Sequence, residues 1–195
     1  MKVRDNDLGR KRIMRKLIMW QMLTVDGLFE GPDADIGWFA FDEDLGKYID
    51  EVHHEVGTYI YGRATYRMMA SYWPSAKGSF AAFMNNVEKI VFSATLDRAD
   101  WNNTTLLKGD AVQEVTKLKH REGRDIFLVG SARLASTLIE HDLVDEYRFG
   151  INPLLLGSGT PFFKGGSNRL DLKLIHSKTL KSGVVILHYK RRRSQ

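Results

Sequence analysis

The feature that most constrains this chain is a repeated alternation between short apolar runs and amphipathic segments. The runs TYIYG (58–62), EKIVFSA (88–94) and DIFLVG (125–130) are short and rich in β-branched or aromatic residues, as strands are. Segments with apolar residues at helical spacing separate most of these runs. Strands that alternate with helices in this way predict parallel strands joined by helical crossovers.

Two further stretches define the centre and the edge of the predicted sheet. RKLIMWQMLTV (15–25) is almost continuously apolar, which is typical of a central strand buried on both faces. LDLKLIHSKTLKSGVVILHYKR (170–191) alternates apolar and polar residues on either side of KSG, which predicts a hairpin. We therefore predict a three-layer α/β sandwich: a mostly parallel central sheet with helices on both faces and an antiparallel C-terminal hairpin.

The remaining elements follow from apolar spacing and from capping residues. In 42–56, acidic residues fill the first turn, and apolar residues recur at helical spacing from Leu45 to Val56. Asp110 is a suitable N-cap for a helix that Gly123 would end. The other predicted elements are helices over 63–70, 79–87 and 131–143, strands over 104–108 and from 144, and a long loop over 26–42.

Length and composition are those of one domain without a disulfide framework. The chain has 195 residues, of which 43% are hydrophobic, and no cysteine. No apolar run approaches the roughly 20 residues that span a bilayer, and the charged N-terminus is unlike a secretory signal. We expect a basic N-terminal extension over residues 1–14, a single domain over residues 15–191, a cytoplasmic location and no membrane partner.

The formal charge of +5 comes from the two ends of the chain. Residues 1–16 are rich in lysine and arginine, and YKRRRSQ at the C-terminus carries four basic residues in succession. Between these ends, acidic residues outnumber basic ones. Nucleic-acid-binding domains more often place basic residues on a face of the fold itself. We therefore expect solvated tails and no nucleic-acid partner.

One predicted strand ends in residues that suit an anion. In IFLVGSARLAS, Gly130 permits a tight turn, Ser131 is suited to cap the following helix, and Arg133 lies in its first turn. The free N–H groups and the dipole at a helix N-terminus bind anions such as phosphate. The alternative is an ordinary strand-to-helix turn, because the pattern is not the glycine-rich dinucleotide fingerprint.

Two more predicted strand ends carry similar residues. Gly62 ends one strand, and Arg63 and Thr65 open the helix after it with a guanidinium and a hydroxyl. A third strand ends with Ser93 and Thr95. Each feature alone is explained by local structure. Since the carboxyl ends of parallel strands meet at one sheet edge, the three together favour an extended ligand with phosphates.

The order of these motifs resembles that of the dihydrofolate reductase-like superfamily. The matching segments are MWQMLTVDG, YGRATYRMM, IVFSATL, IFLVGSARLASTLIEHDLVDEY and INPLLLGSGTPFF. The resemblance is closest to the reductase domain of riboflavin biosynthesis, the RibD C-terminal type, and its stand-alone relatives, and it covers residues 15–190. It implies the dihydrofolate reductase-like fold, an NADPH-dependent reductase and a homodimer.

The resemblance also implies roles for individual residues. The diphosphate of NADPH would lie on residues 130–134, and the nicotinamide carboxamide would face the backbone of Gln21 and Met22. The segment with Gly157, Ser158 and Gly159 would close the substrate side. The full set of implied cofactor-binding residues is Gln21, Met22, Gly62, Arg63, Thr65, Ser93, Ala94, Thr95, Gly130, Ser131, Ala132, Arg133 and Leu134.

The catalytic acid is less clearly marked. Asp26 lies in TVDG, which is similar to the S-x-D-G of riboflavin-type reductases, where the aspartate lies beside the substrate cleft. The alternative is that Asp26 and Gly27 only form a turn. The helix carboxylate that assists proton transfer in dihydrofolate reductases would align near Gly46, so the resemblance implies that this carboxylate is absent here.

Aromatic and histidine residues allow further interpretations. Trp38, with Trp20, Phe39 and Phe41, could line a flat pocket for a heteroaromatic ring, and the alternative is core packing. His53 and His54 are adjacent on a predicted helix and point in different directions, so we expect no metal site.

Two hypotheses for function remain open. The first is an NADPH-dependent reductase that transfers a hydride to a small pterin-like or pyrimidine-like heterocycle. The second is a non-catalytic nucleotide-binding or regulatory protein with the same fold. The second hypothesis is motivated by the missing helix carboxylate, and it predicts cofactor binding without turnover.

Overall fold

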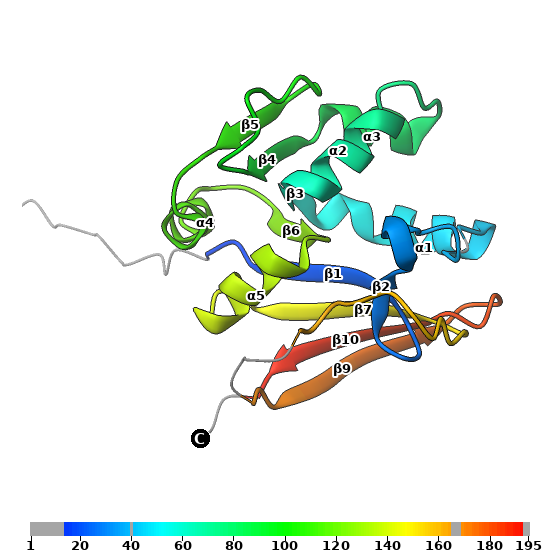
Figure 1. The fold of residues 1–195 in the computed structure, drawn as a ribbon. Helices are drawn as coiled ribbons and strands as arrows, with labels where there is room; N and C mark the ends of the chain where they lie inside the picture. Colours follow the sequence, from blue (N-terminus) through cyan, green and yellow to red (C-terminus); the bar gives the residue numbers. More distant parts are fainter. Residues whose placement is uncertain (1–13, 40, 165–168, 193–195) are drawn as a thin grey trace, which may run out of the picture.

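A computed structural model describes residues 14–39, 41–164 and 169–192, so the predicted extension, apart from Met14, lies outside the described residues. One eight-stranded sheet with the order β5-β4-β3-β6-β1-β7-β10-β9 forms its centre (Figure 1). These strands are β1 (Leu17–Thr24), β3 (Val56–Gly62), β4 (Glu88–Phe92), β5 (Thr104–Leu107), β6 (Asp125–Val129), β7 (Glu146–Asn152), β9 (Leu172–Thr179) and β10 (Val185–Arg191).

The strand directions confirm the predicted sheet. From β5 to β7 every neighbouring pair is parallel, whereas β10 is antiparallel to β7 and to β9. The last two strands form the predicted C-terminal hairpin across residues 180–184. The carboxyl ends of the parallel strands therefore all lie at one edge of the sheet, where ligands of such folds bind.

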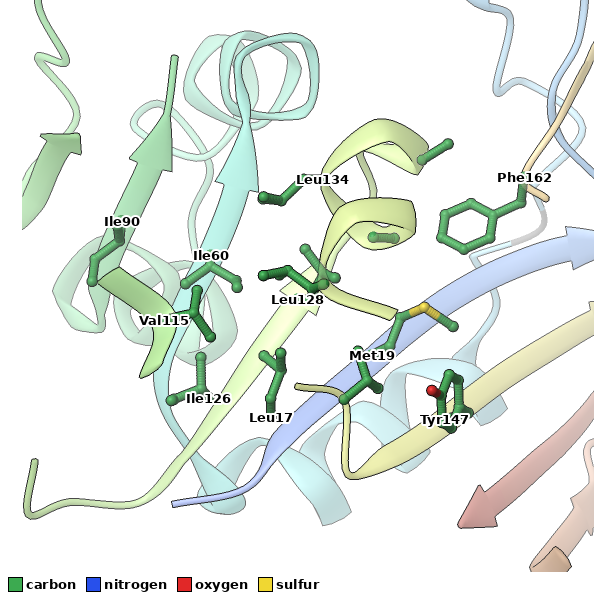
Figure 2. Close-up of a cluster of buried hydrophobic side chains, with 14 of the residues drawn as sticks. Leu17, Met19, Ile60, Ile90, Val115, Ile126, Leu128, Leu134, Tyr147 and Phe162 are labelled. Carbon is green, nitrogen blue, oxygen red and sulfur yellow. The ribbon is translucent and has the colours of Figure 1, made fainter. Parts of the chain in front are cut away.

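Helices cover both faces of the sheet, as predicted. They are α1 (Glu43–Val52), α2 (Arg63–Tyr72), α3 (Ser79–Asn86), α4 (Ala111–Lys119) and α5 (Ala132–Glu140), with short 3-10 turns at Pro32–Ala34 and His53–Glu55. Apolar residues of α4 and α5 share one buried cluster (Figure 2). Residues of α2 and α3 form a second cluster, and residues of α1 a third. The result is the three-layer sandwich.

Strand β1 shows why the sheet has two buried faces. Leu17 and Met19 belong to the cluster under α4 and α5, where Figure 2 shows them beside Leu128. Ile18, which lies between them, packs in the cluster that includes α2 and α3. Successive side chains of a strand point to opposite faces. The continuous apolar run was therefore correctly interpreted as a strand buried on both sides.

The helix boundaries confirm one prediction, an N-cap, and correct two others. Asp110 caps α4, and its carboxylate accepts hydrogen bonds from the N–H groups of Val112 and Gln113. The prediction that Gly123 ends this helix is wrong. The helix ends at Lys119, and Gly123, with φ of +140°, lies in the turn before β6. Likewise Val56 belongs to β3 rather than to the predicted apolar stripe of a helix.

The long loop over 26–42 contains a short strand that the sequence did not predict. β2 (Leu28–Glu30) pairs antiparallel with β8 (Thr160–Pro161), which ties this loop to the segment after β7. Within the described residues no helix has the length and apolar character needed to cross a bilayer.

Candidate functional site

A large cavity of about 1440 Å³ lies at the carboxyl ends of β3, β4 and β6 and beside the end of β1. Cavities that hold one small ligand have volumes of roughly 300–1,000 Å³, so this one has room for two. The three predicted strand ends meet here because β4, β3 and β6 are neighbours in the sheet. Gly62, Ser93 and Gly130 all line the cavity.

Helices α2 and α5, which begin where the strand ends meet at the cavity, lack the usual caps, and so does α3, whose Phe80 also lines the cavity. None of the three has a side-chain hydrogen bond at its N-cap or an acidic residue in its first turn, whereas α1 and α4 are both capped by aspartates. Arg63 and Arg133 instead lie in the first turns of α2 and α5 and line the cavity. A cation at this position is unfavourable for the helix itself, but it attracts an anion to the uncapped N–H groups.

Ser131 has the N-cap position of α5 but does not act as predicted. Its side chain makes no capping hydrogen bond, and its backbone has a left-handed φ of 56°. The expectation that Ser131 caps this helix is therefore wrong. The reason is that Gly130, also left-handed with φ of +66°, turns the chain so that the hydroxyl of Ser131 lies against the neighbouring strand end.

The two glycine turns pack against each other. A Cβ atom on Gly62 would lie 2.1 Å from Oγ of Ser131, and a Cβ atom on Gly130 would lie 2.6 Å from Oγ1 of Thr65. Each turn therefore needs glycine because the hydroxyl residue of the other turn occupies the space. This contact sets the uncapped starts of α2 and α5 side by side.

The third strand end is attached to the second by a hydrogen bond. Nη1 of Arg63 donates to Oγ1 of Thr95 at 2.5 Å. Oγ of Ser93 accepts hydrogen bonds from the N–H groups of Thr95 and Leu96. The turn after β4 is thus fixed by local hydrogen bonds, and it holds the Arg63 guanidinium at the edge of the cavity.

Strand β1 contributes backbone groups on its β6 side. Pairing of β1 with β6 stops at Trp20 and Val129, whereas pairing with β7 continues to Thr24 and Asn152. Along a strand, the backbone N–H and C=O groups of successive residues point alternately to one neighbouring strand and to the other. The carbonyl of Lys16 accepts a hydrogen bond from the N–H of Ile126 in β6, so every second residue after Lys16 also points to β6. The N–H and C=O of Met22 therefore point to β6 beyond the end of the ladder.

The other half of the cavity is mostly aromatic. It lies under the loop over 26–42 and between α1, α2 and α3. Trp38, which the sequence analysis assigned to the site, lines it, and so does Trp20. The ring of Trp20 stacks on Tyr48 at 5.6 Å between centroids. The further aromatic residues that line the cavity are Phe29, Phe39, Phe41, Tyr59, Tyr61, Tyr72, Trp73, Phe80, Phe92 and Phe127.

Several buried polar atoms at this cavity have no hydrogen-bond partner in the structure. They are Oε1 of Gln21, Nε1 of Trp38, Nδ1 of His53 and the hydroxyl of Tyr61. Gln21 is 9% exposed and Tyr61 is fully buried. Burial raises the pKa of the Tyr61 hydroxyl well above its ordinary value, so this group stays neutral. A buried polar atom without a partner is costly, so these four residues leave hydrogen-bonding groups unsatisfied around the cavity.

The structure brings most of the residues predicted for the site to this one cavity. The predicted residues that line it are Gln21, Met22, Trp38, Gly62, Arg63, Thr65, Ser93, Ala94, Thr95, Gly130, Ser131, Ala132, Arg133 and Leu134. Asp26, Gly157, Ser158 and Gly159 are not among the lining residues. Thr160, the residue after Gly159, does line the cavity.

Asp26 is held by the loop after β7. Its carboxylate accepts hydrogen bonds from the hydroxyl of Thr24 and from the N–H groups of Leu156 and Gly157. The hydrogen bond from Thr24 is the main reason that the pKa of Asp26 falls to about 2. A carboxyl group with this pKa is ionised at neutral pH and does not donate a proton there.

The glycines near Asp26 allow a close backbone approach. A Cβ atom on Gly159 would lie 2.2 Å from the carbonyl oxygen of Glu30 in β2. Gly157, with φ of +76°, donates its N–H to Asp26. This segment thus shapes the wall that contains Glu30, a residue that lines the cavity.

Several cavity residues were not predicted as site residues. His53 was considered only as a metal ligand, but it lines the cavity and its ring lies 4.9 Å from that of Phe83. Tyr59 and Tyr61 also line it, and their spacing by two in TYIYG was an available signal that they share a face. Phe80 and Met68 come from other helices, and no local pattern links them to the site. No group of three or more potential metal-ligating side chains occurs in the described part of the chain.

The family of this chain follows from comparison with known proteins. The family model described as the RibD C-terminal domain matches residues 15–186. The chain therefore belongs to the RibD C-terminal domain family, as the motifs indicated. It is also 33% identical over 189 residues to the uncharacterized protein YyaP of Bacillus subtilis (strain 168), covering 94% of this chain and 97% of that protein.

Solved structures share the fold. A protein from Shewanella sp. PV-4, provisionally assigned to riboflavin biosynthesis, superposes with a TM-score of 0.76 at 20% identity, covering 91% of this chain and 99% of the other. The dihydrofolate reductase from Enterococcus faecalis, complexed with NADP(H), gives a TM-score of 0.64 at 14% identity, with coverage of 91% and 97%. These similarities confirm the dihydrofolate reductase-like α/β fold.

Proposed function

We propose that this protein is an NADPH-dependent reductase that transfers a hydride to a small pterin-like or pyrimidine-like heterocycle. The observation that carries the proposal is the pair of uncapped helix starts, on α2 and α5, that face one cavity together with Arg63 and Arg133. Such an arrangement suits a ligand with several phosphates. The complex of the E. faecalis enzyme with NADP(H) supports the choice of cofactor.

The residues present fit this cofactor. The N–H groups at the start of α5, with Arg133, would hold the diphosphate, and Arg63 with Thr95 would hold the 2′-phosphate that distinguishes NADPH from NADH. The backbone N–H and C=O of Met22 match the donor and acceptor of a carboxamide. When bound, the cofactor supplies the hydride.

The protein contributes position and shielding to such a reaction. Hydride transfer depends mainly on alignment of the two reactants and on exclusion of water. The aromatic walls from the loop over 26–42 and from α2 exclude water from the region next to β1. Asp26, through Leu156 and Gly157, holds the segment that carries Thr160, so we assign it a positioning role. Among the described residues, Glu30 is the acidic residue that lines the cavity, and we propose it as a source of the proton.

A cofactor titration tests the proposal. The wild-type protein should bind NADPH more tightly than NADH, and Arg63→Ala should lose about tenfold or more of that preference, because one charge-assisted phosphate contact contributes about 1.5–3 kcal/mol. Binding is measured by quenching of tryptophan fluorescence. Arg98→Ala is the control, since Arg98 lies in an exposed ion pair with Asp100 and does not line the cavity. Equal affinity of the wild type for both cofactors would refute the assignment of Arg63.

One observation favours a second candidate, a nucleotide-binding protein without catalysis. The residues by which α1 and the adjoining turn line the cavity are Ile49, Val52 and His53, and none is a carboxylate. This candidate predicts NADPH binding without oxidation of NADPH across pterins and pyrimidine-type compounds. Turnover of any of these compounds, monitored by the loss of NADPH absorbance, would exclude the non-catalytic candidate.

A further inference from the structure

Tyr48 of α1 connects a wall of the cavity to the C-terminal hairpin. Its ring stacks on that of Trp20 in β1, with 5.6 Å between the centroids and 20° between the planes. Its hydroxyl shares a hydrogen bond of 2.5 Å with Nε2 of His188 in β10. Trp20 lines the cavity, whereas Tyr48, which is 2% exposed, does not. Tyr48 therefore affects the cavity through its contact with Trp20.

This tyrosine joins two strands that are not neighbours in the sheet. Trp20 of β1 pairs with Arg148 of β7, and Arg148 pairs with His188 of β10. Directly opposite residues share a face of the sheet, so Tyr48 contacts both ends of this row of three. The guanidinium of Arg148, in the middle of the row, is bonded to the carboxylates of Glu55 and Glu146.

Trp20 lies beside the backbone groups proposed for the nicotinamide carboxamide. It forms the last pair of the β1–β6 ladder with Val129, which also lines the cavity, and Gln21 and Met22 follow it along the chain. A rotation of the Trp20 ring would therefore change the shape of the cavity at the end of β1.

The hydrogen bond between Tyr48 and His188 is more than packing requires. The other buried residues of their surroundings are apolar, namely Leu45, Leu180, Val184 and Ile186. A phenylalanine would fill the same space without the loss of hydration that burial of a hydroxyl entails. A hydrogen bond, unlike an apolar contact, is directional. The bond to His188 therefore fixes the orientation of the Tyr48 ring and of the Trp20 ring stacked on it.

Both partners of this hydrogen bond are neutral at physiological pH. Burial raises the pKa of Tyr48 to about 12. Burial, with the nearby charge of Arg148 and the neighbouring His176, lowers the pKa of His188 to about 4. Because a hydroxyl can both donate and accept, either neutral tautomer of His188 completes the bond. The contact thus forms without burying a charge.

Residues of β9 restrict the same pair from the hairpin. The ring of His176 lies 5.2 Å from that of His188. Nζ of Lys178 lies 5.4 Å from the centroid of the Tyr48 ring and 2.7 Å from a carboxylate oxygen of Glu51 in α1. Both partners of the hydrogen bond therefore have further contacts that limit their movement.

We propose that Tyr48 and His188 are positioning residues, which hold the ring of Trp20 in the orientation that shapes the cavity beside the end of β1. This inference rests on the proposed function, because it takes the nicotinamide to bind next to Trp20. The alternative is that the pair only attaches α1 to the sheet. Loss of the hydrogen bond would then lower stability without a selective effect on one part of the cavity.

Two ligands that occupy different parts of the cavity distinguish these possibilities. NADPH would extend to the end of β1, whereas adenosine 2′,5′-bisphosphate has the 2′-phosphate but no nicotinamide. Tyr48→Phe and His188→Leu should each weaken NADPH binding by about fivefold, the effect of one hydrogen bond, and leave the affinity for the bisphosphate unchanged. His188→Gln keeps a hydrogen-bonding group near the position of Nε2 and should restore the affinity for NADPH. Calorimetric titration of the full-length protein measures both ligands.

Tyr66→Phe is the matched control for the loss of a buried hydroxyl. Tyr66 is 4% exposed, its hydroxyl accepts a hydrogen bond from the N–H of Trp101, and it does not line the cavity. This variant should be destabilised in urea to an extent similar to Tyr48→Phe, because each loses one buried hydrogen bond. Its affinities for NADPH and for the bisphosphate should equal those of the wild type.

The orientation of Trp20 is also measured without any ligand. Near-ultraviolet circular dichroism reports tryptophan rings held in one orientation, and Trp20→Phe defines the share of the signal that belongs to Trp20. Tyr48→Phe and His188→Leu should diminish that share, and His188→Gln should restore it. The inference is overturned if the share is unchanged in both variants, or if NADPH and the bisphosphate weaken equally. A wild-type protein that binds neither ligand would refute the proposed cofactor, and the Trp20 signal would then decide the inference alone.

Discussion

Single residues at the strand ends determine how the two turns of the candidate site pack together. Gly62 leaves room for Ser131, and Gly130 leaves room for Thr65, so each glycine is required by a residue of the other turn. The left-handed backbone at Ser131 is a further sign of constraint, since non-glycine residues rarely adopt it. Strained backbone of this kind persists where the surroundings enforce it, often at functional sites.

The strand-end contact leads to a stability prediction. Gly130→Ala should destabilise the protein by about 1–3 kcal/mol, because alanine is strained at φ of +66° and its Cβ would lie 2.6 Å from Oγ1 of Thr65. Urea denaturation followed by circular dichroism measures the effect. Gly109→Ala is the control, since a Cβ there meets nothing within 4 Å. If the two variants were equally stable, the packing between the turns would not limit residue choice.

Asp26 gives a prediction about acid stability. Its pKa is lowered from 3.8 to about 2, so its ionised form stabilises the folded state above about pH 4. This contribution is lost as the pH falls toward 2, because the carboxylate then becomes protonated in the folded state as well. The wild type should therefore be more stable than Asp26→Asn at pH 6, and the difference should vanish near pH 2.

Thermal unfolding at several pH values measures this difference. Asp97→Asn, at an exposed position, is the control and should show no comparable trend. The same variants separate the positioning role from direct proton donation. Asp26→Asn should weaken substrate binding without moving the pH dependence of turnover. A displaced pH profile would instead support a direct catalytic role for Asp26.

At the scale of elements, the predictable part of the fold is the part encoded in contiguous sequence. Strand β1 and the C-terminal hairpin follow from patterns within single segments. The pairing of β2 with β8 does not follow from such patterns, because both strands are too short to show periodicity and they lie far apart in the sequence. The end of α4 was also predicted wrongly. The helix stops at Lys119, four residues before Gly123.

The same distinction holds for the candidate site. Its strand-end residues were predictable because parallel strands bring their carboxyl ends together. Its aromatic half was predictable only in part. Trp38 was expected there from its loop, whereas Tyr59 and Phe80 come from a strand and a helix far from that loop in the chain. The reciprocal contacts of the two glycine turns also depend on distances between side chains that no single-sequence pattern contains.

A buried histidine connects the hairpin to α1 and makes stability depend on pH. Tyr48 of α1 and His188 of β10 share a hydrogen bond of 2.5 Å between the hydroxyl and Nε2. Burial, with the nearby charge of Arg148 and the neighbouring His176, lowers the pKa of His188 from 6.5 to about 4, although Glu146 and Glu55 oppose this shift. The folded state therefore holds His188 neutral at pH values where the unfolded chain protonates it.

The expected result is a loss of stability on acidification. Between pH 6.5 and 4 the unfolded state binds more protons at this residue, so the free energy of unfolding of the wild type should fall by roughly 1–2 kcal/mol relative to His188→Gln. Denaturant titrations at pH 7 and pH 4.5 measure the difference. His54→Gln, at an exposed position, should follow the wild type. Parallel behaviour of wild type and His188→Gln would show that His188 has the same pKa in the folded and the unfolded state.

At the scale of the whole molecule, β9 is the edge of the sheet that offers an apolar surface. Leu174 and Ile175 are 47% and 44% exposed on it. A bulge leaves Ile175 without a paired residue on β10, because His176 pairs with His188 and Leu174 with Tyr189. Bulges hinder simple edge-to-edge strand pairing. If two copies associate here, side chains rather than a continued ladder must hold them together.

We therefore predict a homodimer whose interface includes these two side chains. Light scattering at micromolar concentration should give about twice the mass of the 22.3 kDa chain. Leu174→Lys combined with Ile175→Lys should reduce this to the mass of one chain, because lysines in an apolar contact must be desolvated. Val25→Lys, at a position 60% exposed on another part of the surface, should leave the mass unchanged. A wild-type protein with the mass of one chain would contradict the homodimer. A double variant that stays dimeric would show that the interface does not depend on these two side chains of β9.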